Sequence, residues 1–132
     1  PHHIENIEAE ANIQPMADQL EIHPFFTQKD TAAYCRKKGI QVQAWSPLGH
    51  GTVLDNQVLC EIGSKYHKSS AQIALRWELQ QDIIPITKSM NPGRMAQNAD
   101  IFDFCLTAQE CVRITGLGED GRTGPDPDHI GF

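Results

Sequence analysis

Residues 16–45 have the sequence MADQLEIHPFFTQKDTAAYCRKKGIQVQAW, and this stretch decides the expected fold class. Over residues 16–23, and again over residues 40–45, the side chains divide into two alternating sets, which is the two-residue period of a β-strand. Residues 27–38 lack this period and end before Gly39, a favoured residue at the C-terminal cap of a helix. A strand, a helix and a second strand in this order predict parallel strands in an α/β protein.

Capping signals predict where the helices begin. Thr27 followed by Asp30 resembles a capping box, so the helix between the two strands is expected to begin at Thr27. Asn91 followed by Pro92 is a stronger signal, because asparagine caps a helix and proline suits its first turn. Further helices are expected over about residues 3–11, 56–66, 70–81 (capped by Ser69 or Ser70) and 107–117 (with a Thr107–Glu110 capping box).

The expected third strand, residues 83–88, is nearly continuous in apolar residues, as a parallel strand buried on both faces would be. The first two strands differ, because one face of each is polar and carries Gln19, Glu21, Gln41 and Gln43. A closed barrel usually fills its interior with Val, Ile and Leu. These polar faces either lie in solvent or point into a polar barrel mouth completed by other strands, and periodicity leaves both open.

Composition limits the partners of this 132-residue chain. Eleven Lys and Arg against 17 Asp and Glu give a formal net charge of −6, which argues against nucleic-acid and anionic-membrane partners. No run approaches the roughly 20 apolar residues that span a bilayer. Cys35, Cys60, Cys105 and Cys111 form no CxxC pair and no zinc-spaced set with histidine. We therefore expect free thiols in a reducing compartment such as the cytoplasm, and no metal.

Residues 88–94, Lys-Ser-Met-Asn-Pro-Gly-Arg, form the clearest candidate binding segment. A strand, a short loop and a capped helix place free backbone N–H groups at the helix start, where an anion can bind. Lys88 and Arg94 add two cations, and an arginine can hold a phosphate through two hydrogen bonds. In βα barrels, phosphates often bind at the loops after the last two strands. The alternative is an ordinary helix start with solvated charges.

Two further residues admit both a functional and a structural role. Trp45 ends the second strand before a Ser-Pro-Leu-Gly loop, where an indole can stack on a flat ring or fill the rim of the core. His23 with Glu21 admits a general acid–base pair, although a histidine before proline at a strand end is more often structural. His2 and His3 are expected at the surface. The sequence contains no P-loop, Gly-x-Gly-x-x-Gly or Gly-x-Ser-x-Gly motif.

Several segments, in order, resemble the aldo-keto reductases. The three most specific are DQLEIHP (18–24), AWSPLG (44–49) and ITKS (86–89) with Arg94 and Asn98. Residues 71–77 and 100–104 resemble a later helix and linker of that family, and residues 121–128 resemble the tail of bacterial 2,5-diketo-gluconate reductases. The agreement in order and spacing runs almost end to end.

The resemblance implies an α/β fold that is the C-terminal part, strands six to eight, of a TIM (β/α)8 barrel. Such a barrel takes about 250 residues, so it would be incomplete in this chain. Residues 1–132 would form the partial barrel, with residues 118–132 as an irregular C-terminal arm. Pro1 would follow the family's fifth strand. The family's catalytic Asp, Tyr, Lys and His would then all precede this chain, which would hold no catalytic residue.

The resemblance also implies which residues bind NADP(H). Gln19 matches a contact to the nicotinamide carboxamide, and Trp45 matches the aromatic residue that stacks on the nicotinamide ring. The remaining matches are Ser46, Leu48 and Gly49 along the pyrophosphate, Lys88, Ser89, Met90 and Arg94 around the adenosine 2′-phosphate, and Gln97 and Asn98 at the adenine. Thr87 replaces the usual Pro and Gln97 the commoner Glu, and neither change removes a phosphate ligand.

The implied function is NADPH-dependent reduction of aldehydes or ketones to alcohols by the complete enzyme, with this chain as its cofactor-binding half. The implied partners are a small carbonyl substrate and the missing N-terminal half of the barrel. The alternative is a non-catalytic NADP(H)-binding module or an inactive gene fragment, because three parallel strands leave an open sheet edge.

Overall fold

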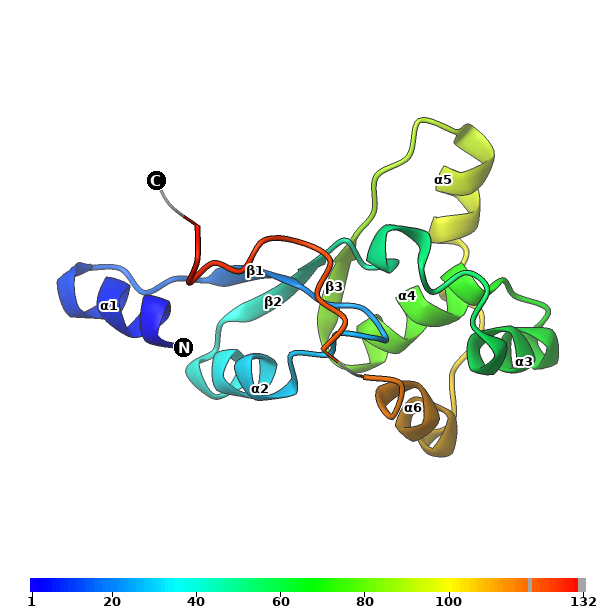
Figure 1. The fold of residues 1–132 in the computed structure, drawn as a ribbon, viewed down its shortest axis with the longest axis horizontal. Coiled ribbons are helices and arrows are strands. Elements are labelled where there is room, and N and C mark those ends of the chain that lie inside the picture. The colour runs from blue at the N-terminus through cyan, green and yellow to red at the C-terminus, as the bar shows by residue number, and fades with distance from the viewer. Residues whose placement is uncertain (119, 131–132) are drawn as a thin grey trace.

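A three-stranded parallel sheet forms the centre of the computed structural model, which describes residues 1–118 and 120–130 (Figure 1). Its strands are β1 (Ala17–Glu21), β2 (Gln41–Trp45) and β3 (Ile83–Ile86), in the order β1-β2-β3. The prediction of neighbouring parallel strands is therefore confirmed. The first strand is shorter than predicted, because His23 leaves it to pair with Phe26 in an isolated antiparallel bridge. The third strand ends at Ile86 rather than Lys88.

Helices follow each strand, which is the connection that parallel strands require. The helices are α1 (His2–Glu10), α2 (Lys29–Lys38), α3 (Gln57–Tyr66), α4 (Ser70–Gln80), α5 (Pro92–Ala99) and α6 (Ala108–Thr115), with a short 3-10 turn, η1 (Gly49–Gly51). Among the described residues no helix is both long and apolar enough to cross a membrane.

Most of the predicted caps are confirmed. Ser69 caps α4 and Thr107 caps α6, each in a complete capping box with the residue three positions later. The Asn91 side chain caps α5 by accepting a hydrogen bond from the Arg94 amide at 3.1 Å. Gly39 ends α2 with φ = 73°, a left-handed conformation that glycine adopts without a steric penalty.

The predicted capping box at Thr27 is wrong. Helix α2 begins at Lys29, and its N-terminal cap is Gln28 in a left-handed conformation with φ = 43°. The Gln28 side chain does not cap the helix and instead donates to the backbone carbonyl of Glu21 at 3.0 Å. This bond links the residue before α2 to the end of β1, and a capping-box pattern does not include that partner.

The hydrophobic core lies between one face of the sheet and helices α2, α3, α4 and α6. Val42 and Ala44 of β2 point into it, together with Ile83 of β3. Trp77 of α4 is 2% exposed and donates its indole N–H to Thr115 at 3.2 Å, so it is a core residue.

The other face of the sheet follows the strand register. Gln19 lies opposite Gln43, which lies opposite Ile84 of β3 on its other side. In the same way, Glu21 lies opposite Trp45, which lies opposite Ile86. Ile84 is 44% and Ile86 is 40% exposed, so the prediction that the third strand is buried on both faces is wrong for this chain. Within the described residues, β1 and β3 each leave one edge unpaired.

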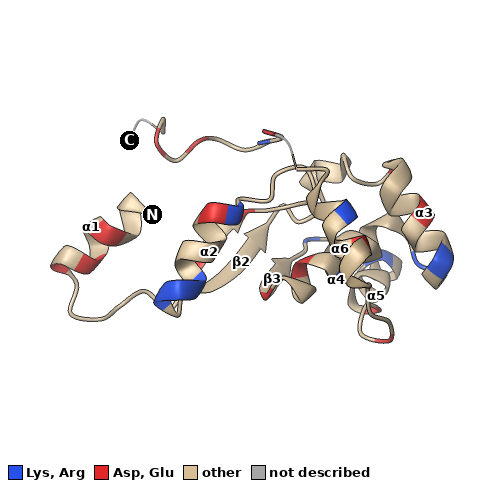
Figure 2. Cartoon of the chain, turned by 90° about the horizontal axis from the view of Figure 1, so that it is seen from below, with Lys and Arg blue, Asp and Glu red and all other residues tan. Residues whose placement is uncertain are grey.

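The charged residues are distributed over many elements. Arg36, Lys37 and Lys38 occupy the last turn of α2, where cations complement the helix dipole. Figure 2 shows further Lys and Arg on α3 and α6, separate from this turn. All four cysteines are free, as predicted.

Glu78 is fully buried on α4, and its carboxylate oxygens have no hydrogen-bond partner among the residues that the structure describes. Burial therefore raises the pKa of Glu78 well above its ordinary value. An unpaired buried polar group costs about 1–3 kcal/mol, so Glu78→Leu is expected to raise the free energy of unfolding by about that amount at neutral pH.

The test for Glu78 is urea denaturation across pH, with Glu78→Gln as the polar control. Because the folded-state pKa is the raised one, the stability that the neutral carboxyl retains is lost as the pH rises above the ordinary pKa of glutamate. The Gln and Leu variants should both lack this loss, and only the Leu variant should gain the full stability. A Leu variant less stable than the parent at neutral pH would contradict the account.

Candidate nucleotide-binding site

The carboxyl-terminal ends of the three strands meet at one edge of the sheet because the strands are parallel (Figure 1). This is the edge at which βα barrels bind their ligands, in the loops that follow the strands. Gln19 lies within β1, Trp45 ends β2, and the segment from Lys88 follows β3. The candidate site therefore has two parts, one over β1 and β2 and one beyond β3.

Gln19 and Trp45 lie on the sheet face opposite the helical core. The Gln19 side chain donates to the Gln43 side chain at 2.8 Å, which fixes the amide across the two strands. Both Gln19 and Trp45 line a cleft of about 530 Å³ between β1, α1 and the C-terminal arm. The structure thus brings together the two residues predicted to contact the nicotinamide.

The loop after β2 is unusually tight. Ser46, Gly49 and His50 have φ values of 51°, 51° and 53°, and only glycine adopts this region without strain. The Ser46 hydroxyl accepts a hydrogen bond from the His50 amide at 3.3 Å, which closes the turn. A Cβ at position 49 would lie 3.2 Å from His23 Nδ1, so the loop also needs glycine there for close packing. Non-glycine residues in this conformation cluster at functional sites.

The C-terminal arm is fastened to the sheet by Glu21, a carboxylate buried at the end of β1. Its Oε1 accepts a hydrogen bond from the Thr123 amide at 2.7 Å and another from the Thr123 hydroxyl. Its Oε2 accepts from the Gly124 amide at 3.0 Å. Residues 120–130 contain no helix or strand, whereas residues 119, 131 and 132 of the predicted arm lie outside the described residues. These bonds join positions about 100 residues apart in sequence.

The electrostatics of Glu21 and His23 follow from this burial. Burial acts to raise the pKa of Glu21, but the hydrogen bonds from Thr123, Gly124 and His23 outweigh it and hold that pKa below its ordinary value. Burial lowers the pKa of His23, although Glu21 Oε1 lies 3.3 Å from its Nε2. His23 is therefore a neutral structural residue beside an ionised carboxylate, and the acid–base interpretation of this pair is not supported by the structure.

The arm also covers part of Trp45. A Cβ added at Gly124 would overlap the outer edge of the Trp45 indole, so the arm backbone lies directly on that ring. Arg122 places its guanidinium 4.7 Å from the centre of the Phe26 ring, which adds a cation–π contact. The arm therefore helps to fix the orientation of Trp45 at the cleft.

The segment after β3 carries the predicted anion-binding residues. Ser89 accepts a hydrogen bond from the Asn91 amide at 3.1 Å, and Asn91 in turn caps α5. Lys88 and Arg94 are exposed, and neither forms an ion pair with any described residue. Gln97 and Asn98 lie three and four residues beyond Arg94, on the same face of α5. This group does not line the cleft that holds Gln19 and Trp45.

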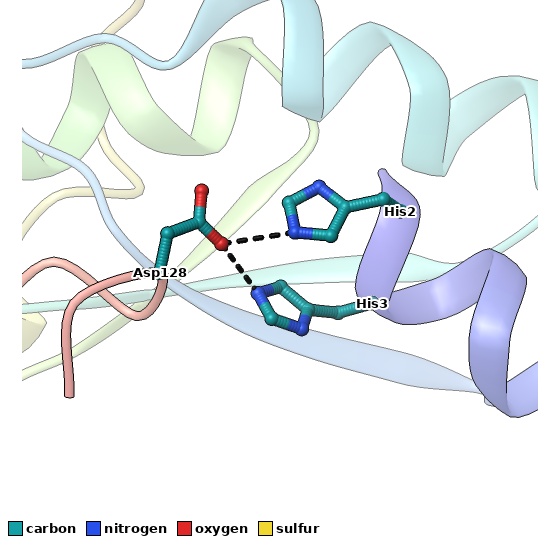
Figure 3. A group of neighbouring side chains, drawn as sticks. All are labelled: His2, His3 and Asp128. Carbon is teal, nitrogen blue, oxygen red and sulfur yellow. Dashed lines mark hydrogen bonds and ion pairs between the residues drawn. The ribbon is translucent and has the colours of Figure 1, made fainter. Parts of the chain in front are cut away.

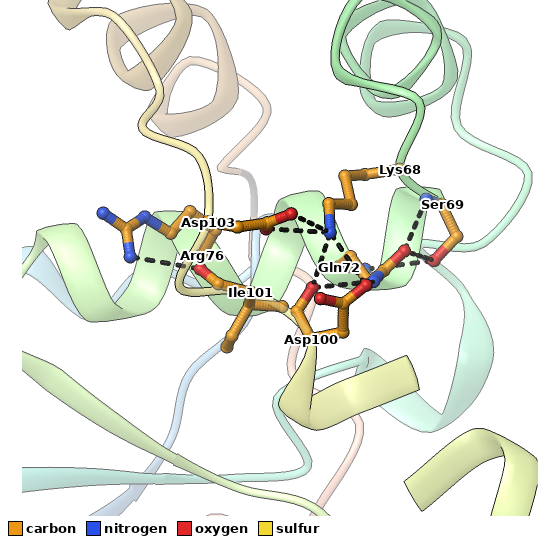
Figure 4. Close-up of polar contacts among 7 residues, drawn as sticks. All are labelled: Lys68, Ser69, Gln72, Arg76, Asp100, Ile101 and Asp103. Atoms are coloured by element: carbon orange, nitrogen blue, oxygen red, sulfur yellow. Dashed lines mark hydrogen bonds and ion pairs between the residues drawn. The ribbon is translucent and has the colours of Figure 1, made fainter. Parts of the chain in front are cut away.

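Helix α5 has no buried residue, and Met90 just before it is 95% exposed. Its position depends on the linker that follows it (Figure 4). Lys68 binds the carboxylates of Asp100 and Asp103, each at 2.8 Å, and the Asp100 carbonyl at 3.1 Å.

Helix α4 supplies two more bonds to the same linker. Gln72 donates to the Asp100 carbonyl at 2.8 Å, and Arg76 donates to the Ile101 carbonyl at 3.1 Å. The Lys68 side chain is only 9% exposed, whereas the carboxylates of Asp100 and Asp103 are 61% and 62% exposed, so the ion pairs are shielded on the lysine side only. Lys68, Gln72 and Arg76 therefore hold the base of α5.

Sequence reasoning missed Glu21 as the anchor of the arm and Lys68 as the anchor of α5. The resemblance singled out DQLEIHP, which contains Glu21, and DIFDF, which contains Asp100 and Asp103, the two carboxylates that Lys68 binds. In both cases the other partner of the contact is far away in sequence. The positive φ of Ser46 left no signal in the residue type, because serine is not typical of that conformation.

Parallel strands joined by helices, with the candidate site in loops at the carboxyl ends, are the arrangement expected of part of a βα-barrel protein. A model of the aldo/keto reductase family matches residues 1–119. The chain belongs to the aldo/keto reductase family.

The curated relatives are oxidoreductases about twice as long as the chain. Glyoxal reductase of Bacillus subtilis is 47% identical over 131 residues, which are 99% of this chain and 48% of that protein. Methylglyoxal reductase DkgA of Escherichia coli K12 is 38% identical over 132 residues, 98% of this chain and 48% of that protein. The chain therefore spans about half the length of the relatives it matches.

Solved structures show the same fold. The chain is similar to the apo form of Gox0644 with a TM-score of 0.96 at 37% identity, covering 99% of this chain and 49% of that one. A Gox0644 mutant in complex with NADPH gives a TM-score of 0.95 with the same identity and coverage. The predicted fold class, an incomplete TIM barrel, is confirmed.

Proposed function

We propose that the complete protein is an NADPH-dependent reductase of aldehydes or ketones and that this chain is its cofactor-binding half. The observation that supports this most strongly is the arrangement of the site. A cleft with a fixed amide and an indole lies over β1 and β2, and two cations that have no ion-pair partner among the described residues flank the capped start of α5. An extended ligand with a flat ring at one end and a phosphate at the other fits this donor set.

Each part of the site then has a role toward NADPH, which supplies the hydride when bound. Gln19 would hold the carboxamide, and Trp45 would stack on the nicotinamide and fix which face reacts. Ser46, Leu48 and Gly49 would follow the pyrophosphate. Lys88, Ser89, Met90 and Arg94 would hold the 2′-phosphate, with Gln97 and Asn98 at the adenine. Orientation of the cofactor is the contribution of these residues to rate.

The catalytic residues and the remaining strands belong, in this proposal, to an N-terminal half outside this chain. The edges of β1 and β3 are unpaired in the described sheet, and Ile84 and Ile86 are exposed on the face that a closed barrel would cover. Both features suit a partner half that completes the barrel. The substrate would be a small carbonyl compound. The four free cysteines suit a reducing compartment such as the cytoplasm.

A chimaera tests the proposal in an intact barrel. In it, this chain replaces the matching residues of B. subtilis glyoxal reductase, whose remaining half supplies the other strands. NADPH should quench the tryptophan fluorescence of the chimaera in a saturable way. Trp45→Phe should remove most of the quench contributed by this chain, while Trp77→Phe, a change in the core, should retain it.

The isolated chain is titrated in parallel to separate the alternatives. Saturable binding by the chain alone would favour the non-catalytic module. Binding by the chimaera only would favour the half-barrel proposal. A chimaera that folds, as judged by circular dichroism, but binds no NADPH would contradict the proposed role of this chain.

A further inference from the structure

His2, His3 and Asp128 converge at the rim of the cleft (Figure 3). The two histidines begin α1, and Asp128 lies in the C-terminal arm. The Nε2 atoms of His2 and His3 lie 2.9 Å and 2.7 Å from the same oxygen, Oδ1 of Asp128. All three ligand atoms lie within 4.8 Å of one another, and the imidazole rings are only 4.1 Å apart.

This donor set selects one class of ligand. Two imidazole nitrogens and one carboxylate oxygen suit Zn²⁺ and similar transition-metal ions, whereas Mg²⁺ and Ca²⁺ prefer oxygen alone. Zn²⁺ bound by three protein groups keeps a fourth position for water. The side chains are 58%, 55% and 49% exposed, so an ion could reach them without any opening of the fold.

In the structure both imidazole nitrogens contact the same carboxylate oxygen. A divalent cation between the three groups would take the place of any proton on these nitrogens and would spread the ligand atoms to its own coordination distances. Asp128 supplies a negative charge to the site.

We propose that His2, His3 and Asp128 form a surface site for a transition-metal dication of the Zn²⁺ class, which fastens the C-terminal arm to α1. The site joins positions 125 residues apart. The arm is anchored to the sheet at Glu21 and reaches α1 at Asp128, so the ion would close the span of arm that borders the cleft. The ion would therefore stabilise the arm. It would not bind to Gln19 or Trp45.

The test is calorimetric titration with ZnCl₂ of an untagged protein in which the two exposed thiols are removed by Cys60→Ser and Cys105→Ser. Both the 132-residue chain and the chimaera described above are titrated. One equivalent is expected to bind. Mutation of a residue that only supports a metal ligand lowers metal affinity by about 10–100-fold. His3→Gln and Asp128→Asn remove a ligand itself, so each should raise the Kd for Zn²⁺ by at least about tenfold.

His129→Gln is the matched control, because His129 lies on the same arm but its side chain bonds only Asp126 among the described residues. It should leave the Kd unchanged. Zn²⁺ should also slow amide hydrogen exchange over residues 121–130 in the parent and not in Asp128→Asn. The proposal is overturned if neither protein binds Zn²⁺, if His3→Gln and Asp128→Asn bind as tightly as the parent, or if bound Zn²⁺ leaves exchange in the arm unchanged.

Discussion

Replacing Arg94 by alanine in the chimaera is expected to weaken NADPH binding by about 10- to 100-fold, because a hydrogen bond to a charged group contributes about 1.5–3 kcal/mol. The affinity for NADH should change by less than about twofold. Arg94 is exposed and unpaired among the described residues, so its loss removes no internal contact of its side chain. The difference between the two cofactors is therefore a direct measure of its contact with the 2′-phosphate.

Isothermal titration with each cofactor gives this comparison. Arg113→Ala is a matched control, because Arg113 is another exposed arginine but pairs with Glu61 at 3.0 Å on the α3–α6 side of the molecule. It should leave both affinities unchanged. An equal loss of affinity for NADPH and NADH in Arg94→Ala would contradict the assignment of this residue to the 2′-phosphate.

The second large effect is expected at Glu21. The change Glu21→Gln replaces one acceptor oxygen by an N–H donor that faces the amides or hydroxyl of the arm. A hydrogen bond to a buried charged group contributes about 1.5–3 kcal/mol, so the free energy of unfolding should fall by about 3 kcal/mol or more. The arm should also become a substrate for limited proteolysis at residues 120–130.

The pH dependence of Glu21 has a defined sign. Its folded-state pKa is below the ordinary value, so its stabilisation is complete above the ordinary pKa of glutamate. That stabilisation is lost as the pH falls through the folded-state value, when the carboxyl is protonated and cannot accept as many hydrogen bonds. Urea denaturation of the parent should show this acid loss, and Glu21→Gln should lack that component.

The variant Thr123→Val measures the contribution of the Thr123 hydroxyl to stability, apart from that of the backbone amides that also bind Glu21. It removes one donor to Glu21 Oε1 and leaves the two amide donors in place. A loss of about 1 kcal/mol is expected, smaller than that of Glu21→Gln. Equal stability of Glu21→Gln and the parent at neutral pH would show that the arm is held by packing on Trp45 and Phe26 instead.

Local signals in the sequence predicted most helix starts correctly. The caps at Ser69, Asn91 and Thr107 depend on residues only three positions apart, so the sequence contains both partners of each bond. The failure at Thr27 has the opposite cause. Gln28 precedes α2 in a left-handed conformation and bonds the end of β1, and the Thr27–Asp30 motif carries no information on that partner.

The sheet was predicted in its order and direction but not in the burial of β3. A continuous apolar run predicted burial on both faces, yet Ile84 and Ile86 are 44% and 40% exposed. The apolar residues on this uncovered face suit burial inside the complete barrel to which the strand belongs, and the contacts within this chain do not account for them. Gln19, Gln43 and Glu21 share that face of the sheet. The sequence left open whether these polar side chains lie in solvent, and in this chain the face is partly exposed and is covered by the C-terminal arm at Glu21.

The candidate site was predictable where its residues follow a strand directly. The strand, the loop and the cap by themselves suggest an anion site at Lys88 and Arg94, with a helix start bearing solvated charges as the alternative, and the anion site stays a prediction. The anchors Glu21 and Lys68 could not be predicted, because their hydrogen bonds cross about 100 and 32–35 positions, respectively. Strain at Ser46 also depends on the packed loop and not on the residue type.

The most direct test of the half-barrel account is the rate of NADPH oxidation by the chimaera with methylglyoxal as the carbonyl substrate. The account predicts a saturable reaction with NADPH, a much slower one with NADH at the same concentration, and none when this chain or the Bacillus half is assayed alone. A folded chimaera that oxidises no NADPH, or one that prefers NADH, would contradict the claim that this chain supplies the NADPH-binding half of a carbonyl reductase.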